Sequence, residues 1–548
     1  MIKTRKKKSV LTLILCVLAL GFTAFIFAPI EQYMLNQSEM WFNLGDIVLP
    51  AVLSFLVLSV LLIDMGYIMH HHSRRILSAL VLALAVCLYL QGNFLNPDYG
   101  ELDGRAVPWG DFKVYAILDT LFWVAVPILF VTLAVKKRRL FRKLARGLAA
   151  ALLIIQGVTL VTVLLTHPIE NRRGDWIVSD KNQFVLGEEQ NTVVFVVDAC
   201  DTTYIPRILD EDPDALAALD GFTYYSDYAG AYSKTKMGLP YILTQVWYEN
   251  DQTIEDYIDQ AYEGVPLYRA LAEDGWDIRL YTAETYLSER MIGTADNVIR
   301  ANLTVGSTTR LFAKMMQFVG FRYLPHLAKP ACVFYSGDFG FYKASDHQNQ
   351  PYFKDNFLFR ERLEADGVTT REGKSFVVYH INGSHLPCNM DENGKNVGNW
   401  NTTACEQTKG VLRTILTPYL EQMKALGIYD SANIIITADH GRFDEGPSSP
   451  VMLLKRAGEH GELKENAAMA SVSDLHATLF KLCGLESDAP AIFELDESEN
   501  RTRRYLYYPT TRNNGGTLPP LTEYHVERGQ EFVPTGLVLQ GGKENIVK

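Results

Sequence analysis

Long apolar runs fill the first third of the chain, and shorter ones replace them afterwards. Polar residues interrupt the early part only between five runs, each close to the roughly 17–25 residues of a membrane-spanning helix. These runs lie at residues 10–28, 47–68, 76–90, 115–135 and 147–166. The pattern predicts a five-span transmembrane domain over residues 1–166. The first run has no evident cleavage site and is expected to remain as an anchor.

The basic residues around these runs predict the orientation. The segments before the first run, between the second and third, and between the fourth and fifth hold 14 of the 52 Lys and Arg and no acidic residue. The other two connections contain few basic residues. The positive-inside rule therefore places the N-terminus in the cytoplasm and the chain after Thr166 outside. We expect a multi-pass protein of the cell membrane, in a bacterium the plasma membrane, with an extracellular or periplasmic domain.

After a polar stretch at residues 167–190, predicted to be a linker, the pattern changes to short runs. Strand-like apolar segments alternate with segments of helical spacing, which predicts an α/β domain over residues 191–548. Because the strand-like segments are continuously apolar, we expect a mostly parallel sheet covered by helices on both faces. The expected strands lie at residues 192–198, 277–282, 375–381, 433–437 and 450–455, and the expected helices at residues 265–275, 409–427 and 471–484.

The charge of the outer part limits its partners. The chain has a formal net charge of −11, and outside the three basic segments 38 basic residues face 63 acidic ones. Such a balance argues against nucleic acid as a partner and suits divalent cations. Cys388 and Cys405 flank a polar loop, and an external location permits a disulfide between them, although the sequence is equally compatible with free thiols.

Polar residues end or shortly follow three of the predicted strands. Asp198 ends the first, His385 follows the segment 375–381, and Asp439 and His440 follow the segment 433–437. A single Asp after a strand is most often a helix cap. In a parallel sheet, however, these strand ends meet at one edge. Two carboxylates and an imidazole there form a site suited to Zn²⁺ or Mn²⁺.

The stretch AYSKTKMGLP places Thr235 between two lysines just before an apolar run. A Lys-Thr-Lys sequence is usually a solvated loop. Here it precedes a predicted helix start, where free backbone N–H groups favour phosphate. A metal ion can lower the pKa of a threonine hydroxyl and make it a nucleophile. Thr235 is therefore a candidate to attack a phosphorus centre, with Lys234 and Lys236 adding positive charge.

Together these features resemble the membrane-anchored phosphotransferases of the alkaline phosphatase/sulfatase superfamily, which include lipoteichoic acid synthases and lipid A phosphoethanolamine transferases. The resemblance implies a sulfatase-like fold and a metal held by Asp198, Thr235, Asp439 and His440. It makes Thr235 the nucleophile. The sequence Asp-His-Gly at residues 439–441 is its most specific part.

The resemblance extends to expected substrate-binding residues. Ser-His-Leu-Pro at residues 384–387 is similar to the family's Ser-His-Gly-Pro, whose histidine contacts the phosphoryl group, so His385 takes that role. Lys234 resembles the lysine before the nucleophile of the lipoteichoic acid synthases. The segment 471–484 resembles a superfamily helix, with Ala477 where proline is usual, and His476 within it is expected to face the site.

The sequence also departs from the family. The first metal ligand is Asp198 instead of the glutamate usual in both transferase groups. The cysteines that bracket the nucleophile loop of lipid A transferases are missing, and the Trp and Arg that bind glycerol phosphate in the lipoteichoic acid synthases are not identifiable. The metal preference and the substrate therefore stay open.

The function implied is transfer of phosphoethanolamine or glycerol phosphate from a membrane phospholipid, through phospho-Thr235, to an envelope glycan or lipid. The alternative enzyme is a metal-dependent phosphodiesterase or sulfatase-like hydrolase of envelope components. The Cys-x-Pro-x-Arg context of a sulfatase nucleophile is absent around Thr235 and Cys200. A non-catalytic membrane scaffold, the third possibility, predicts gaps among the ligands that the sequence does not have.

Three further acidic residues have a plainer interpretation. Asp201 and Asp444 are expected to be caps, surface charges or packing residues. Asp119 lies inside a predicted span, where a carboxylate is costly, so it is expected to serve the helix bundle or a substrate path.

Overall fold

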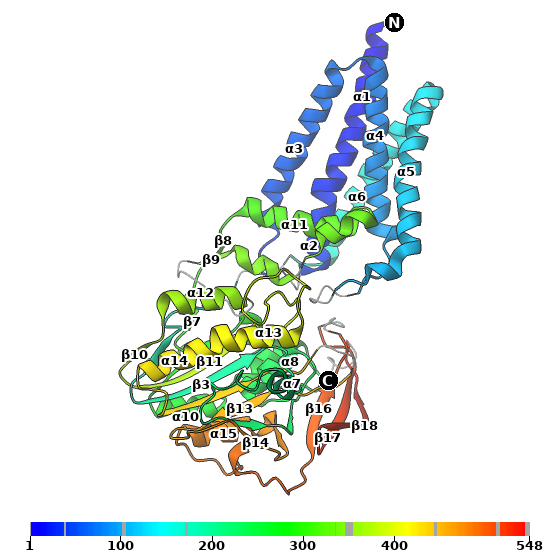
Figure 1. Ribbon diagram of the computed structural model, residues 1–548. Helices are drawn as coiled ribbons and strands as arrows, with labels where there is room; N and C mark the ends of the chain where they lie inside the picture. The colour runs from blue at the N-terminus through cyan, green and yellow to red at the C-terminus, as the bar shows by residue number, and fades with distance from the viewer. Residues whose placement is uncertain are drawn as a thin grey trace. The chain divides into compact units, whose positions relative to one another are not determined.

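The chain forms two compact units (Figure 1). One, the helical unit, comprises Met1–Asp175 with Asn302–Asp346, and the other, the α/β unit, comprises Trp176–Ala301 with His347–Lys548. The computed structural model describes residues 2–37, 40–100, 106–169, 174–334, 336–345, 355–442, 446–510 and 516–542. Asp444 lies outside these described residues.

Among its described residues, the helical unit contains five helices long and apolar enough to cross a membrane, as predicted. Helix α1 runs on through a π-helical turn into α2, and α1 contacts α3, α4 and α6. The long helices and α2 are α1 Ile2–Gly21, α2 Ala28–Leu35, α3 Gly45–Ile68, α4 His71–Leu90, α5 Lys113–Lys136 and α6 Arg138–Thr166.

The second segment of the helical unit corrects the predicted domain boundary. Asn302–Asp346, predicted to lie in the α/β domain, contains α11 Thr308–Tyr323 and the antiparallel pair β8 Leu303–Val305 and β9 Lys343–Ser345. It belongs to the helical unit because the apolar face of α11 shares a core with α3. Leu311, Phe312 and Met315 form that face.

Asp119 on α5 holds this segment in place. Its Oδ2 accepts a hydrogen bond of 2.7 Å from the backbone N–H of His326, and its Oδ1 one of 3.3 Å from the Tyr115 hydroxyl. The Tyr323 hydroxyl at the end of α11 donates to the buried carboxylate of Glu31. Of the two roles expected for Asp119, the contacts support service to the bundle, because its carboxylate is satisfied within the protein.

The α/β unit is built on a seven-stranded sheet of order β14-β4-β13-β12-β3-β11-β6. The neighbours β12, β3, β11 and β6 are parallel, whereas β13 is antiparallel to both β12 and β4. This confirms the predicted mostly parallel sheet. The strands are β3 Gln190–Val197, β4 Thr223–Tyr225, β6 Trp276–Tyr281, β11 Lys374–Ile381, β12 Ala432–Thr437, β13 Met452–Lys455 and β14 Lys464–Asn466.

Helices cover both faces of this sheet (Figure 1). Along β3, Val194 and Val196 face one core with α8, α9, α10 and α15, and Val193 and Phe195 face the other with α7, α12, α13 and α14. The helices are α7 Tyr204–Glu211, α8 Thr235–Thr244, α9 Ile254–Ala261, α10 Pro266–Glu273, α12 Asn356–Asp366, α13 Ala404–Val411, α14 Thr417–Ala425 and α15 Leu475–Leu482. The central strands β3 and β11 are buried along all but their first residue, which explains their nearly continuous apolar runs.

Smaller sheets complete the unit. Two of them contain residues of the predicted linker, so the segment without strands is shorter than predicted. Strands β1 and β2 fall within residues 167–190, where they pair with β7 and β10, and Ile177 and Leu186 are fully buried. A three-stranded antiparallel sheet, β16-β17-β18, lies near the C-terminus. These strands are β1 Trp176–Val178, β2 Val185–Gly187, β5 Tyr228–Ala229, β7 Val298–Arg300, β10 Thr369–Arg371, β15 Ala470–Ser471, β16 Arg503–Tyr507, β17 Leu521–Glu527 and β18 Glu531–Leu539.

The cysteines are all free thiols, so the disulfide considered between Cys388 and Cys405 is not formed. The Cys388 thiol faces the backbone carbonyl of Ser384 at 3.9 Å, while Cys405 lies in the first turn of α13. Burial raises the pKa of Cys388 to about 11 and keeps it protonated at neutral pH.

We expect Leu280→Ala in β6 to destabilise the α/β unit by about 2–5 kcal/mol, because Leu280 is fully buried and its removal leaves a cavity. Thermal unfolding of the detergent-purified chain measures the effect. The matched control is Leu537→Ala on β18, a position 47% exposed, where a change within about 0.5 kcal/mol is expected. Equal effects of the two substitutions would contradict the burial of β6.

Candidate active site

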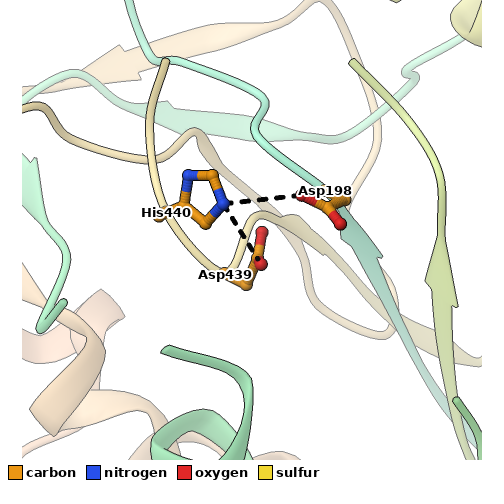
Figure 2. Close-up of side chains that lie close together, drawn as sticks. All are labelled: Asp198, Asp439 and His440. Atoms are coloured by element: carbon orange, nitrogen blue, oxygen red, sulfur yellow. Dashed lines mark ion pairs between the residues drawn. The ribbon is translucent and has the colours of Figure 1, made fainter. Parts of the chain in front are cut away.

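The site forms where the parallel strands β12, β3 and β11 end at one edge of the sheet. Asp198 directly follows β3, and Asp439 and His440 follow β12. All three residues are at least 95% buried. Figure 2 shows the imidazole of His440 directed at both carboxylates. The predicted convergence of strand ends therefore brings the three expected ligands together.

The distances define a small polar cluster. His440 Nε2 lies 3.6 Å from Asp198 Oδ1 and 3.6 Å from Asp439 Oδ2 (Figure 2). The potential ligand atoms of the three residues all lie within 4.8 Å of one another. This is the geometry expected of side chains arranged around a common cation.

Two oxygens in this cluster identify what the cluster can hold. Among the described residues, Asp198 Oδ1 and Asp439 Oδ2 are buried and accept no hydrogen bond. A buried ionised oxygen without a donor is costly unless a cation satisfies it. Two carboxylates and one imidazole suit Zn²⁺ or Mn²⁺ and do not distinguish between them. The residues therefore fit a divalent metal ion.

The backbone fixes the orientation of the ligands. His440 Nδ1–H donates to the carbonyl of Gly441 at 2.6 Å, which leaves the Nε2 lone pair for the cluster. Ala199 has a positive φ of 58°, and this turn aims its N–H at Asp439 Oδ1 over 3.2 Å. A non-glycine residue in this conformation is strained, so the turn is maintained by its surroundings.

Charge around Asp198 favours its ionised form. Burial alone raises the pKa of this carboxyl, but the nearby imidazoles of His385, His380 and His440 outweigh burial and hold the pKa well below its usual range. Asp198 is therefore an anion throughout the physiological pH range, as a metal ligand must be.

Thr235 is the first residue of α8 and is mostly buried. Its Oγ1 lies 3.2 Å from His440 Nε2, so the predicted nucleophile is in contact with the predicted ligands. Gly238 permits this approach, because a Cβ there would lie 2.3 Å from the carbonyl oxygen of Asp439. The loop before Thr235 is tied down by Ser233, whose hydroxyl donates to the carbonyl of Tyr508 at 2.8 Å.

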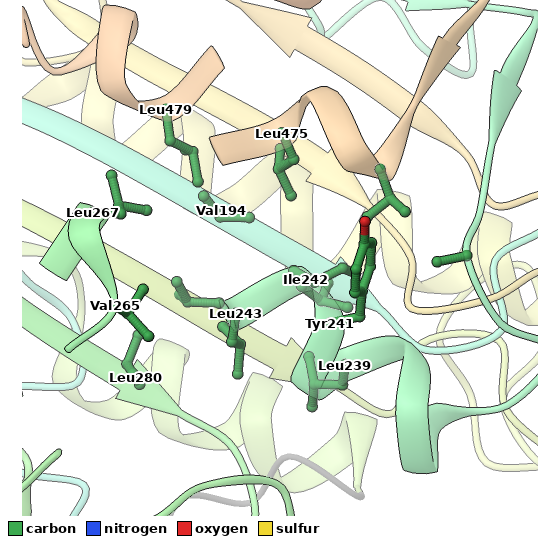
Figure 3. Close-up of a cluster of buried hydrophobic side chains, with 14 of the residues drawn as sticks. Val194, Leu239, Tyr241, Ile242, Leu243, Val265, Leu267, Leu280, Leu475 and Leu479 are labelled. Carbon is green, nitrogen blue, oxygen red and sulfur yellow. The ribbon is translucent and has the colours of Figure 1, made fainter. Parts of the chain in front are cut away.

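The rest of α8 is embedded in the core, which keeps Thr235 in position. Figure 3 shows Leu239, Ile242 and Leu243 of α8 among side chains from β3, β6, α10 and α15. All three are at least 97% buried. Because a close-packed helix cannot shift without opening cavities, its first residue is held as rigidly as the strand ends.

Of the three predicted substrate-binding residues, the structure places two near the cluster and one away from it. His385 is half-buried and near enough to Asp198 to lower the pKa of that carboxyl. Lys234 is the N-cap residue of α8 and is mostly buried beside Thr235. His476 is not brought to the cluster. Its Nε2 donates to the carbonyl of Ile242 at 3.0 Å, seven residues along α8 from Thr235.

The sequence analysis did not predict that Asp201 and His380 take part in the structure of the site. Asp201 is 1% exposed and does not cap α7, whose N-cap residue is Thr203. Its Oδ1 accepts the N–H of Thr203 at 2.9 Å, and its Oδ2 accepts the N–H of Arg442 at 3.0 Å, so it joins the loops after β3 and β12. His380 on β11 is buried with its Nε2 3.5 Å from Asp198 Oδ2. The available signal was a histidine inside an otherwise apolar strand.

Comparisons with known proteins identify similar structures only. No family model matches the chain, and no curated protein matches it. Similar solved structures include a protein of the alkaline phosphatase superfamily from Vibrio parahaemolyticus, with 12% identity and a TM-score of 0.36 over 65% of this chain and 84% of that one. The lipoteichoic acid synthase LtaP from Listeria monocytogenes has 12% identity and a TM-score of 0.33 over 63% and 87%. A 2-O GAG sulfatase has 11% identity and a TM-score of 0.38 over 63% and 85%.

We expect Asp439→Asn to weaken divalent metal binding by more than about 100-fold. Mutation of a residue that only hydrogen-bonds to a metal ligand typically weakens binding by about 10–100-fold, and loss of a ligand itself should cost more. The amide removes the negative charge from the buried oxygen that accepts no hydrogen bond. Elemental analysis of the dialysed, detergent-purified chain measures bound Zn²⁺ and Mn²⁺. Asp488→Asn, at an exposed position, is the control and keeps the wild-type metal content. Equal metal in both variants would exclude this cluster as the site.

His476 predicts a pH-dependent stability. Burial lowers its pKa from 6.5 to about 4. Above pH 6.5 the imidazole is neutral in both the folded and the unfolded chain. As the pH falls from 6.5 toward 4, the unfolded chain gains a proton that the folded one does not, so the free energy of unfolding decreases by up to about 3 kcal/mol.

His476→Gln is expected to remove this part of the acid destabilisation, whereas His525→Gln, at an exposed position on β17, leaves it unchanged. Thermal unfolding between pH 4 and 7 measures both. If the stability of His476→Gln decreased with falling pH as much as that of the wild type, the pKa of His476 would not be lowered by burial against α8.

Proposed function

We propose that this chain is a sulfatase-like phosphotransferase of the alkaline phosphatase superfamily. It transfers a substituted phosphoryl group, phosphoethanolamine or glycerol phosphate, from a membrane phospholipid to an envelope glycan or lipid. One observation carries the proposal. The Thr235 hydroxyl, at the first residue of a helix, lies 3.2 Å from the Nε2 atom of His440 within the metal-binding cluster.

The proposed reaction has two displacements at phosphorus. In the first, Thr235 Oγ1 loses its proton and bonds to phosphorus, the bond from phosphorus to the diacylglycerol oxygen breaks, and that oxygen takes up a proton. In the second, an acceptor hydroxyl loses its proton and bonds to phosphorus, and the threonine oxygen leaves and is reprotonated. Each step exchanges one P–O bond for another, so no oxidant, reductant or further reactant is needed.

The residues of the site have complementary roles in these steps. Asp198, Asp439, His440 and Thr235 would hold a divalent metal ion, which supplies positive charge against the charge that develops on the phosphoryl oxygens. The N-terminus of α8 presents backbone N–H groups that suit a phosphoryl group. His385 is proposed to orient a phosphoryl oxygen or protonate the leaving group, and Lys234 to contribute positive charge.

The helical unit supports a lipid donor. Its five apolar helices fit a membrane anchor, and an anchored enzyme remains at the surface where phospholipids are available. The proposed orientation, with a cytoplasmic N-terminus and the α/β unit outside, would give that unit access to outer-leaflet phospholipids and to envelope acceptors. Nucleic acid is not among the proposed partners.

A covalent adduct on Thr235 tests the proposal. We expect the detergent-purified chain, incubated with Mn²⁺ or Zn²⁺ and mixed phospholipids, to gain mass on the peptide that contains Thr235. The size of the increment distinguishes phosphoethanolamine, glycerol phosphate and bare phosphate. Thr235→Ala is expected to lose both the adduct and diacylglycerol release, whereas Thr235→Ser retains a hydroxyl and some activity.

The matched control is Thr535→Ala, an exposed position on β18, which is expected to behave as the wild type. Diacylglycerol release that persists undiminished in Thr235→Ala would refute the proposed nucleophile. Thr235-dependent release that continues without any added acceptor would instead assign the chain as a phosphodiesterase, in which water takes the place of the acceptor.

A further inference from the structure

His380 occupies a position on β11 where the neighbouring side chains of the same face are apolar. Phe376 and Val378, which precede it on that face, belong to the core that contains α8. His380 is nevertheless only 2% exposed. A buried imidazole is costly unless both of its nitrogens face polar partners, so its contacts indicate why it is there.

The two ring nitrogens of His380 face two different polar groups. Nδ1 lies 3.0 Å from the hydroxyl of Thr282, the residue directly after β6. Nε2 lies 3.5 Å from Asp198 Oδ2. This second contact is an ion-pair distance and not a hydrogen bond. Because an ionised carboxylate attracts an N–H and repels a nitrogen lone pair, Nε2 carries the proton, and Nδ1 then accepts the hydroxyl hydrogen of Thr282. The three residues come from the ends of three adjacent strands, β6, β11 and β3.

This arrangement divides the two oxygens of Asp198 between two neighbours. Oδ2 faces His380, whereas Oδ1 faces His440 Nε2 at 3.6 Å and accepts no hydrogen bond from the described residues. Electrostatic attraction between this N–H and Oδ2 favours the orientation of the carboxylate in which the other oxygen faces the cluster. Groups that orient metal ligands in this way typically change metal affinity or activity by about 10–100-fold when they are removed.

We propose that His380 is a positioning residue for the metal site, with its tautomer fixed by Thr282 and its Nε2–H fixing the carboxylate of Asp198. The proposal rests on the metal binding of the proposed function. His380 acts through Asp198 and touches neither the metal nor the substrate. Its effect is on cation affinity, and the fold does not depend on it, because an aromatic ring of similar size can fill the same space.

Titration with Mn²⁺ alone tests this proposal. The detergent-purified full chain is stripped with a chelator, and its dissociation constant for Mn²⁺ is measured by calorimetry together with the unfolding midpoint of the metal-free protein. We expect His380→Phe to weaken Mn²⁺ binding by about 10–100-fold without lowering the metal-free midpoint. His380→Gln, which retains an N–H donor, should recover part of the affinity.

Thr282→Val provides a second variant that keeps the imidazole in place. Loss of the hydroxyl frees the tautomer, so weaker Mn²⁺ binding is expected here as well. The matched control is Thr192→Val in β3, a fully buried threonine outside the cluster, for which no change in the dissociation constant is expected.

Each outcome decides the matter. Wild-type affinity in both His380→Phe and Thr282→Val overturns the positioning role and leaves the metal site intact. A wild-type chain that binds Mn²⁺ no better than Asp439→Asn overturns the metal site and the positioning role together. A lower metal-free midpoint in His380→Phe, with Thr282→Val binding as the wild type, assigns His380 a structural role only and also overturns the proposal.

Discussion

The central constraint in this protein is the burial of two carboxylates side by side. Asp198 and Asp439 are both almost completely excluded from solvent, and a carboxylate oxygen of each lies 3.6 Å from the same imidazole nitrogen, Nε2 of His440. Like charges this close and this deep repel each other, and water is not there to screen them. The surrounding histidines relieve part of that repulsion, and a cation in the proposed metal site would relieve more of it. Strongly paired parallel strands resist it mechanically, because β3 lies between β11 and β12 along most of its length.

The sequence was most informative about the central strands and about the polar residues at their ends. Apolar runs of five to seven residues predicted the central strands, and the polar residues at or just after the ends of three runs predicted the cluster, because parallel strands must end at the same edge. Thr235 could be placed as well, since a polar loop before an apolar run indicates the start of a helix. These inferences needed only local pattern and one rule of topology.

Features that depend on how elements pack could not be obtained in this way. An amphipathic helix such as α11 has the same pattern whether it covers a sheet or a helix bundle, so Asn302–Asp346 was assigned to the wrong part of the chain. The direction in which His476 points depends on how α15 meets α8. His380 follows a tyrosine in a strand of eight residues, and only the neighbouring strands reveal that it faces Asp198.

The interrupted course of the chain has a practical consequence for preparing the protein. Because the helical unit takes up Asn302–Asp346 from the middle of the sequence, cutting the chain after the last long helix does not separate the two units. A fragment that begins near residue 168 would carry α11 without the helices that cover Leu311, Phe312 and Met315. Such a fragment would expose an apolar strip and be prone to aggregate. A soluble fragment of the α/β unit would instead need this insertion replaced by a short polar connection between Ala301 and His347.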